Sequence, residues 1–233
     1  IPEGACSGGA SPESASPTST MPTGGEDRPR GPTHAPRADA LAYLQYTSGS
    51  TGKPRGVKLV HANVIAQCAS LAAASRVDAR SRLCSWLPHY HDYGLVGGVL
   101  LPLFAGATSY LMSPLSFLRR PLRWLSAIDR HQITHTGAPN FAYAACVRAL
   151  GEHGWQGHLD SLVNASCGAE PIRAETVQRF QEAFAPHGLL PGAFTPAYGM
   201  AELTLCATLT PHDEPLRIDA EGRVASGRAV AGV

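Results

Sequence analysis

A run of hydroxyl-bearing residues and glycines offers the clearest chemistry in this chain. The segment Tyr46–Gly56 reads Tyr-Thr-Ser-Gly-Ser-Thr-Gly-Lys-Pro-Arg-Gly. Glycines let backbone N–H groups converge, hydroxyls add further donors, and Lys53 and Arg55 add positive charge, which together favour a polyphosphate. A mobile hairpin loop is the alternative interpretation of such a run. The candidate phosphate contacts are Thr47, Ser48, Gly49, Ser50, Thr51, Gly52 and Lys53.

The spacing within this run excludes two other loops. A Walker P-loop needs a glycine five positions before its Gly-Lys pair and a hydroxyl after the lysine, but Thr47 and Pro54 occupy those positions. A nucleophile elbow needs glycines two residues before and after its serine, but Ser48 precedes Ser50. The run therefore predicts a phosphate-binding loop of another kind.

Two histidines and an aspartate lie in the segment Ser85–Gly94, which leaves a predicted strand. A binuclear metal hydrolase would need aspartate at position 93 and histidine at position 94, where Tyr93 and Gly94 stand. The spacing therefore favours a loop histidine, His91, that serves a pocket or simply packs, over a metal ligand.

Three further turns follow predicted strands. Thr136–Tyr143 and Cys167–Pro171 each join a strand to a helix, and Tyr198–Glu202 places an aromatic ring and a carboxylate in one turn. Ligands of parallel sheets bind where strands end, so all three turns are candidates for a binding site. Glu202 is interpreted equally well as a charge at a helix N-terminus and as a magnesium ligand.

Alternating strand and helix patterns must position these segments. The predicted strands are residues 41–46, 56–60, 82–87, 108–112, 133–136, 162–165 and 193–195, and the predicted helices are residues 62–75, 95–104, 121–130, 140–150 and 174–184. Strands separated by helical patterns of about 10 to 15 residues indicate crossover units. The sequence thus predicts an α/β fold with a mostly parallel sheet flanked by helices, whose ligand sites lie at the carboxyl ends of the strands.

Composition limits the function classes. Residues 1–38 are rich in proline, glycine, serine and threonine and are expected to form a linker or disordered segment, so residues 39–233 hold the predicted domain. The formal net charge of +1 lacks the basic excess of a nucleic-acid binder. The uncharged stretch Tyr93–Leu118 is interrupted by Pro102, Gly106 and Pro114, so no membrane span is predicted. The six cysteines form no Cys-x-x-Cys pair and suggest reduced thiols of a cytoplasmic protein.

Taken in order, six segments resemble the adenylate-forming superfamily, and within it the fatty acyl-AMP ligases that load acyl carrier proteins. The likeness runs from Leu41 to about Thr208, and the segments are residues 44–52, 86–92, 112–121, 137–143, 168–171 and 198–202. The resemblance implies a central portion of the large N-terminal domain of such an enzyme. It also implies ATP-dependent activation of a fatty or related carboxylic acid to acyl-AMP, with release of pyrophosphate, for transfer to the phosphopantetheine arm of an acyl carrier protein.

The resemblance assigns roles to residues of this chain. Residues Thr47–Lys53 would hold the β- and γ-phosphates of ATP, and Glu202 would bind Mg²⁺. His91 and Glu202 are the candidate catalytic residues. The adenine slot would comprise Gly168, Ala169, Glu170, Tyr198, Gly199 and Met200. The acyl pocket would be bordered by His91, Gly137, Ala138 and Pro139, with uncharged side chains from Leu95 onward beside an aliphatic tail.

Several positions depart from the family pattern. Arg55 replaces a lysine, Tyr93 replaces a common methionine, and Ala201 stands where acyl-CoA synthetases often have threonine. Ala201 favours the acyl-AMP ligase branch over an acyl-CoA synthetase, which stays an alternative together with a non-catalytic fragment that retains the fold. The family's catalytic lysine lies in a C-terminal domain beyond the matched segments, so the chain alone is expected not to turn over. The acid's identity and the oligomeric state are left open.

Overall fold

The computed structural model describes residues 36–47, 54–211 and 214–230. All of them belong to one compact unit, Pro36–Val233. Most of the predicted linker and all of the loop positions 48–53 lie outside the described residues.

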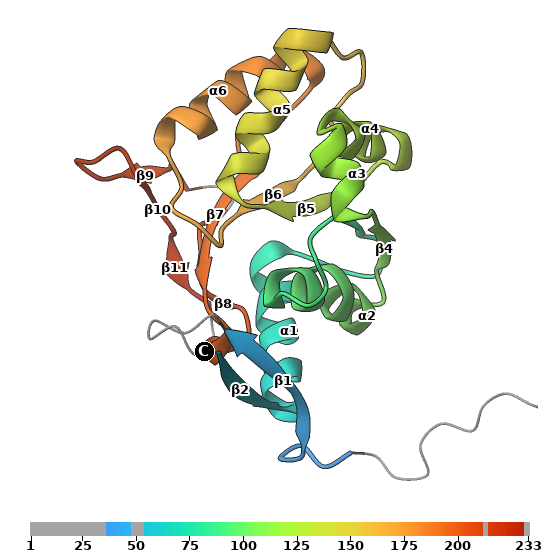
Figure 1. The fold of residues 1–233 in the computed structure, drawn as a ribbon, viewed down its shortest axis with the longest axis vertical. Helices are drawn as coiled ribbons and strands as arrows, with labels where there is room; N and C mark the ends of the chain where they lie inside the picture. The colour runs from blue at the N-terminus through green and yellow to red at the C-terminus, as the bar shows by residue number, and fades with distance from the viewer. Residues whose placement is uncertain (1–35, 48–53, 212–213, 231–233) are drawn as a thin grey trace, which may run out of the picture. The chain divides into compact units, whose positions relative to one another are not determined.

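A twisted sheet with strand order β11-β8-β7-β6-β5-β3-β4 forms the middle layer (Figure 1). The pairs from β7 to β4 are parallel, whereas β8 and β11 add antiparallel strands at the β7 edge. The strands are β3 (Arg82–Ser85), β4 (Thr108–Leu111), β5 (His135–Ala138), β6 (Asn164–Cys167), β7 (Phe194–Gly199), β8 (Cys206–Leu209) and β11 (Arg228–Ala229). This arrangement confirms the predicted α/β class with a mostly parallel sheet.

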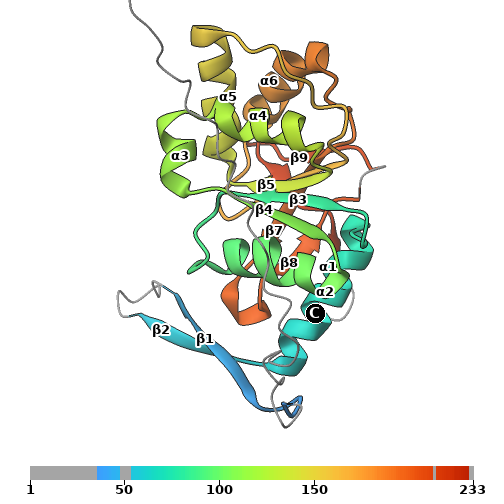
Figure 2. The same cartoon turned by 90° about the vertical axis from the view of Figure 1, so that its right-hand side faces the viewer.

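Helices cover both faces of the sheet, and the two views agree on which helix lies on which side (Figures 1 and 2). One side carries α1 (His61–Ser75), the π-helix η1 (Tyr93–Leu100) and α2 (Leu101–Ala105). The other side carries α3 (Pro114–Arg119), α4 (Leu122–His131), α5 (Asn140–His153) and α6 (Ala174–Phe184), the last followed by the short 3₁₀ turn η2 (Ala185–His187).

Alternation along the strands divides the core in two. Cys84, Ala138, Ala165 and Cys167 pack with aromatic side chains of α4, α5 and α6 in the larger hydrophobic cluster. Their neighbours in the strands point to the opposite face, because successive strand residues alternate between the two faces. On that face Leu83 packs with apolar side chains of α1, η1, α2 and β8, namely Cys68, Leu71, Val96, Leu101, Cys206 and Leu209.

A separate hairpin precedes the sheet. Strands β1 (Leu41–Thr47) and β2 (Arg55–Val60) pair antiparallel, and Thr47 lies opposite Arg55, so the pair brackets residues 48–53. Helix α1 begins directly after β2, where the Asn63 side-chain oxygen accepts the Val60 N–H at 3.0 Å. The predicted phosphate loop is therefore the segment that connects the two strands in the sequence.

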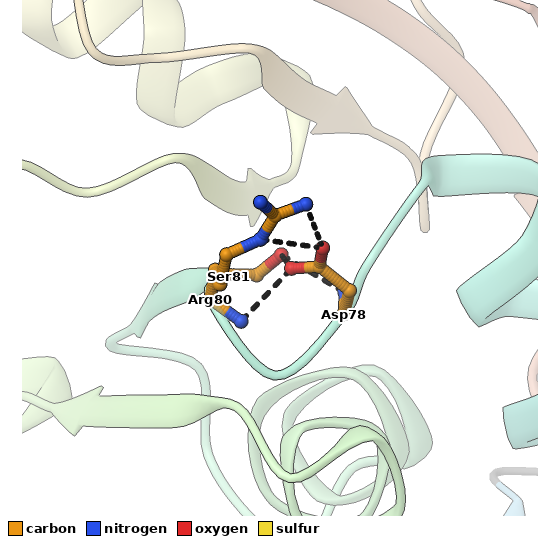
Figure 3. Close-up of polar contacts among 3 residues, drawn as sticks. All are labelled: Asp78, Arg80 and Ser81. Carbon is orange, nitrogen blue, oxygen red and sulfur yellow. Dashed lines mark hydrogen bonds and ion pairs between the residues drawn. The ribbon is translucent and has the colours of Figure 1, made fainter.

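A polar turn leads from α1 into β3 (Figure 3). Asp78 Oδ1 accepts the Arg80 N–H at 2.9 Å and the Ser81 hydroxyl at 3.1 Å, while Ser81 Oγ accepts the Asp78 N–H at 3.0 Å. These bonds form a side-chain-closed turn of the kind that aspartate and serine favour. The turn sets where β3 enters the sheet.

The structure differs from the sequence expectations in several elements. The predicted helix at residues 95–104 begins earlier, at Tyr93, because Asp92 accepts the Tyr93 N–H at 2.6 Å, and its first part is a π-helix. The short strand predicted at residues 193–195 extends to Gly199 through Pro196. The sequence analysis did not predict α3, β8, β9 (Arg217–Ile218), β10 (Val224–Ala225), β11 or the 3₁₀ turns. Within the described residues, no helix is long and apolar enough to cross a membrane.

Candidate functional site

A cavity of about 790 Å³ lies between the sheet and the layer formed by α1, η1 and α2. It extends from the carboxyl ends of β5, β6 and β7 to apolar side chains of α1, β3 and β8. Nine residues predicted for the site line it together: Thr47, His91, Gly137, Gly168, Ala169, Tyr198, Gly199, Met200 and Glu202. Segments that are far apart in the sequence therefore line one cavity, as we expected of turns that follow parallel strands.

Three predicted residues do not line this cavity. Ala138 is completely buried on the opposite face of the sheet. Pro139 occupies the N-cap of α5, and the Glu170 side chain accepts the Phe141 N–H in the first turn of that helix at 2.6 Å. The predicted positions Ser48, Gly49, Ser50, Thr51, Gly52 and Lys53 lie outside the described residues.

At the predicted adenine slot, the turn after β6 lies close to β7, and the end of β7 lies close to the residues that enter β8. A Cβ on Gly168 would lie 2.8 Å from the Ala197 carbonyl oxygen, and a Cβ on Gly199 would run into the Leu205 backbone, so both positions need glycine. Beside them, Tyr198 and Met200 keep 53% and 40% of their surface exposed at the cavity. An exposed aromatic ring and a polarisable thioether form a surface on which a planar base can stack.

Glu202 lies in the 3₁₀ turn η3 (Ala201–Leu203), between β7 and β8. Its side chain is exposed at the cavity, and β1 lies against η3, so the hairpin that leads into residues 48–53 is close to this carboxylate. Magnesium is commonly held by one or two carboxylates together with substrate phosphates and water. The donor set at this turn fits that mode.

A strained residue and a buried glutamine hold the η3 turn in place. Thr204 has a φ of 70°, which is unfavourable for a β-branched residue and marks local backbone strain. The Gln67 side chain on α1 accepts the N–H groups of Leu205 and Cys206 at 3.2 and 2.8 Å. The sequence analysis did not identify Gln67, since a single glutamine in a helical pattern carries no signal of such a contact.

His91 and Asp92 form a pair at the mouth of the cavity. Their Nδ1 and Oδ1 atoms are 2.7 Å apart, and an ionised carboxylate can only accept, so we place a proton on Nδ1 that is donated to Asp92. The hydrogen bond to Asp92 raises the pKa of His91, against an opposing effect of partial burial. Gln45 of β1 donates to the Tyr90 carbonyl at 3.0 Å and ties this loop to the hairpin. The raised pKa favours the protonated form of His91 at the mouth of the cavity.

The inner part of the cavity is mainly apolar. Its lining includes apolar side chains of α1, the following turn, β3, α2, β8 and the residue before β8, namely Leu71, Val77, Leu83, Leu101, Leu205 and Leu209. The polar residues His135 and Asn164 lie among them. The mouth carries the two carboxylates of the lining, Asp92 and Glu202. Among the described residues no three His, Cys, Asp or Glu side chains are grouped as a metal site. One space therefore combines a polar mouth with an apolar arm.

Comparisons with known proteins show which family and fold this chain resembles. The family model described as AMP-binding enzyme matches residues 5–233. The chain is 47% identical over 182 residues to the medium-chain fatty acid–acyl-carrier-protein ligase JamA of Moorena producens, which covers 78% of this chain and 31% of that protein. It is 42% identical over 186 residues to the long-chain fatty acid–AMP ligase FadD26 of Mycobacterium marinum, with 77% and 32% covered.

A solved structure shows the same fold. The fatty acyl-adenylate ligase from L. pneumophila in complex with acyl adenylate and pyrophosphate matches with a TM-score of 0.75 and 36% identity, over 84% of this chain and 36% of that protein. The chain thus spans about a third of the length of the proteins that it resembles.

Proposed function

The chain belongs to the AMP-binding enzyme family, and from this premise we propose that its cavity binds ATP and a fatty acid and takes part in converting them to acyl-AMP and pyrophosphate. The observation that carries the proposal is the union of a polar mouth and an apolar arm in one cavity. The mouth suits a nucleotide and its phosphates, and the arm suits an aliphatic tail.

The proposed reaction brings two anions together. The acid's carboxylate oxygen attacks the α-phosphorus of ATP, a new P–O bond forms, and the bond to pyrophosphate breaks. Groups that stabilise charge in the transition state lower this barrier most. Bound Mg²⁺ would neutralise phosphate charge there, and Glu202 is the residue that we propose to hold it.

The remaining residues of the mouth would bind and orient the nucleotide and the acid. We propose that Tyr198 and Met200 stack on the adenine, while Gly168 and Gly199 let the backbone come close to it. Thr47 and the predicted loop residues 48–53 would donate to the phosphates. His91 would lie beside the reacting carboxylate, where its raised pKa favours a positive charge. Glu170 supports the slot indirectly, because its carboxylate holds the start of α5.

We propose an acyl carrier protein as the acceptor of the acyl group. The 47% identity to an acyl-carrier-protein ligase supports this choice, as does Ala201 in place of threonine. An acyl-CoA synthetase is the alternative. Mixing preformed acyl-AMP enzyme with either CoA or a phosphopantetheinylated carrier protein separates the two, since only the true acceptor should become acylated quickly.

We also propose a cytoplasmic location, where ATP and reduced thiols are available. The five cysteines within the described residues are free and buried, which agrees with a reducing compartment. The near-neutral net charge gives no support for a nucleic-acid partner.

Acid-dependent exchange between ATP and labelled pyrophosphate tests the proposed function. We expect the parent polypeptide, meaning this chain extended to the full length of its relatives, to exchange label only when a fatty acid and magnesium are present. A chain that binds ATP but never exchanges would favour the non-catalytic alternative.

A further inference from the structure

The side chain of Tyr93 crosses the cavity from its helical wall to the sheet. Tyr93 is the first residue of η1, and its hydroxyl lies 2.6 Å from Ser166 Oγ on β6. Ser166 Oγ in turn donates to the Thr136 carbonyl at 3.2 Å, so the Tyr93 hydroxyl is the donor in the first bond. Both hydroxyl protons are thereby used, and the ring is fixed at both ends.

Gly137 fits against this ring. It lies beside Ser166 in the register of β5 and β6. A Cβ at position 137 would collide with the Tyr93 hydroxyl and would lie 2.5 Å from Ser166 Oγ. The phenol therefore fills the space that a side chain at position 137 would need. Tyr93, Gly137 and Ser166 form one closely fitted unit.

The neighbouring strand is also tightly covered at this level. Ser85 of β3 lies next to Gly137 when the β3–β5 register, Cys84 opposite Thr136, is continued by one residue. A Cβ on Gly98 of η1 would be 2.8 Å from Ser85 Oγ, so helix and strand are in direct contact there. Along the row Ser85–Gly137–Ser166, η1 and the sheet are therefore in close contact.

This row separates the two ends of the cavity along the strands. Leu83, His135 and Asn164 lie two residues earlier on the same strands and face the same side, about 7 Å further in. Gly168 and Ala169 lie beyond the carboxyl end of the row, at the mouth. Tyr93 also lines the cavity and bonds to this row, so we expect a chain that runs from the mouth to the apolar arm to pass it.

We propose that Tyr93 determines specificity by limiting the width of the acid at this row, so that the site accepts an unbranched alkyl chain and rejects one that carries a ring. The inference rests on the proposed function and narrows its substrate class. Close packing makes the limit sharp, because a fixed ring and two strands leave little room to adjust. Tyr93 acts on selection between acids and takes no part in the bond changes.

The test compares two acids in the parent polypeptide. Octanoic acid has a slim chain along its whole length. In 4-phenylbutanoic acid, a ring replaces the outer half of that chain. We expect kcat/KM for adenylation to be higher with octanoic acid than with 4-phenylbutanoic acid. Tyr93→Met should lower this ratio by about 10-fold or more, which is the discrimination that one or two methylene groups give in a hydrophobic pocket. Equal losses for both acids in Tyr93→Met would mean a structural role only, and would overturn the inference.

Two milder variants keep the test decisive if Tyr93→Met fails to fold. Tyr93→Phe and Ser166→Ala each remove the bond that fixes the ring, and each should relax the preference in the same direction but by less. An unchanged preference in both variants would contradict the inference. Absence of adenylation with any acid in the unaltered parent would instead contradict the proposed function, so the two failures are distinguishable.

Discussion

The position of Glu202 makes its carboxylate either useful or harmful to a bound triphosphate. It is exposed at the same cavity as Thr47, and the hairpin that carries the predicted phosphate loop lies against its turn. A bare carboxylate there would repel phosphates, whereas one that binds magnesium would attract them. A substitution of Glu202 therefore tests the proposed magnesium site directly.

We expect Glu202→Gln to fold normally and to reduce the adenylation rate of the parent polypeptide by about 100-fold or more, equivalent to about 3 kcal/mol at the transition state. The rate is measured by pyrophosphate exchange across a range of magnesium concentrations. Glu152→Gln on the exposed end of α5 serves as the matched control and should keep full activity. A rate for Glu202→Gln within a few-fold of the parent would show that Glu202 does not act through magnesium.

The His91–Asp92 pair makes stability depend on pH. Its hydrogen bond raises the folded-state pKa of His91 above the ordinary value of 6.5. The pair's contribution to the free energy of unfolding is therefore fully present below that value and is lost as the pH rises through the raised pKa. Asp92→Asn should lower the His91 pKa in an NMR titration of the imidazole and flatten the pH dependence of stability in this window. A His91 pKa that is the same in both proteins would contradict the assigned pair.

At the residue scale, sequence patterns identified residues that line one cavity but did not give the direction of each side chain. Ala138 follows Gly137 in a strand, so alternation turns it to the opposite face. Glu170 follows Ala169 in a turn, and free N–H groups at the start of α5 attract its carboxylate. Tyr93 was noticed as a departure from the family, but its bond to Ser166 joins residues 73 positions apart and leaves no local signal.

At the element scale, helix α5 connects the site to the larger core. Its N-terminus lies beside the turn after β6, and Glu170 and Asn140 form reciprocal bonds there: Glu170 accepts from Phe141, and Asn140 Oδ1 accepts the Arg173 N–H at 3.1 Å. The dipole of a helix favours a carboxylate in this position. The two bonds fix the turn that contains Gly168 and Ala169.

We expect Glu170→Ala to destabilise the protein by about 1 kcal/mol, because Phe141 loses its acceptor and the helix loses a favourable charge. Urea unfolding followed by circular dichroism measures the change. Glu170→Gln keeps an acceptor and should lose less, and Glu152→Ala at the other end of α5 should change stability little. Equal stability of Glu170→Ala and the unaltered protein would show that the observed bond does not stabilise α5.

Element types were largely predictable, and their ends were less so. Apolar periodicity identified α1, α4, α5 and α6 because these helices each bury one face. The sequence did not predict that β7 extends beyond Thr195, because Pro196 and Gly199 are typical of turns. β9, β10 and β11 contain two residues each, too few for any alternation to show.

At the scale of the whole molecule, the described residues leave apolar side chains uncovered. Leu103 of α2 and Leu111 of β4 keep 76% and 66% of their surface exposed, and Leu115 and Leu118 of α3 are exposed as well. Exposed apolar groups of this size favour association. The sequence predicted the alternation of strands and helices, but not the strand order, because pairing between distant segments leaves no periodic signal.

We expect these 233 residues by themselves to bind ATP weakly and to show no multiple turnover. The chain has two lysines, Lys53 and Lys58, and both belong to the hairpin region that precedes every other motif. The resemblance described in the sequence analysis implies an adenylating lysine in a separate C-terminal domain, so we expect neither lysine to serve. Calorimetric titration with ATP and magnesium, followed by an assay for labelled acyl-AMP, checks both parts. Steady product formation beyond one equivalent would show that a second domain is not needed.

Direct detection of acyl-AMP tests the central claim, that this cavity joins a nucleotide to a fatty acid. The parent polypeptide is incubated with ATP, magnesium and octanoic acid without any acceptor, and the bound products are identified by mass spectrometry beside a Glu202→Gln control. The account predicts octanoyl-AMP and pyrophosphate in equal amounts from the parent, and far less from the control. ATP hydrolysis without octanoyl-AMP, or equal octanoyl-AMP from both proteins, would contradict it.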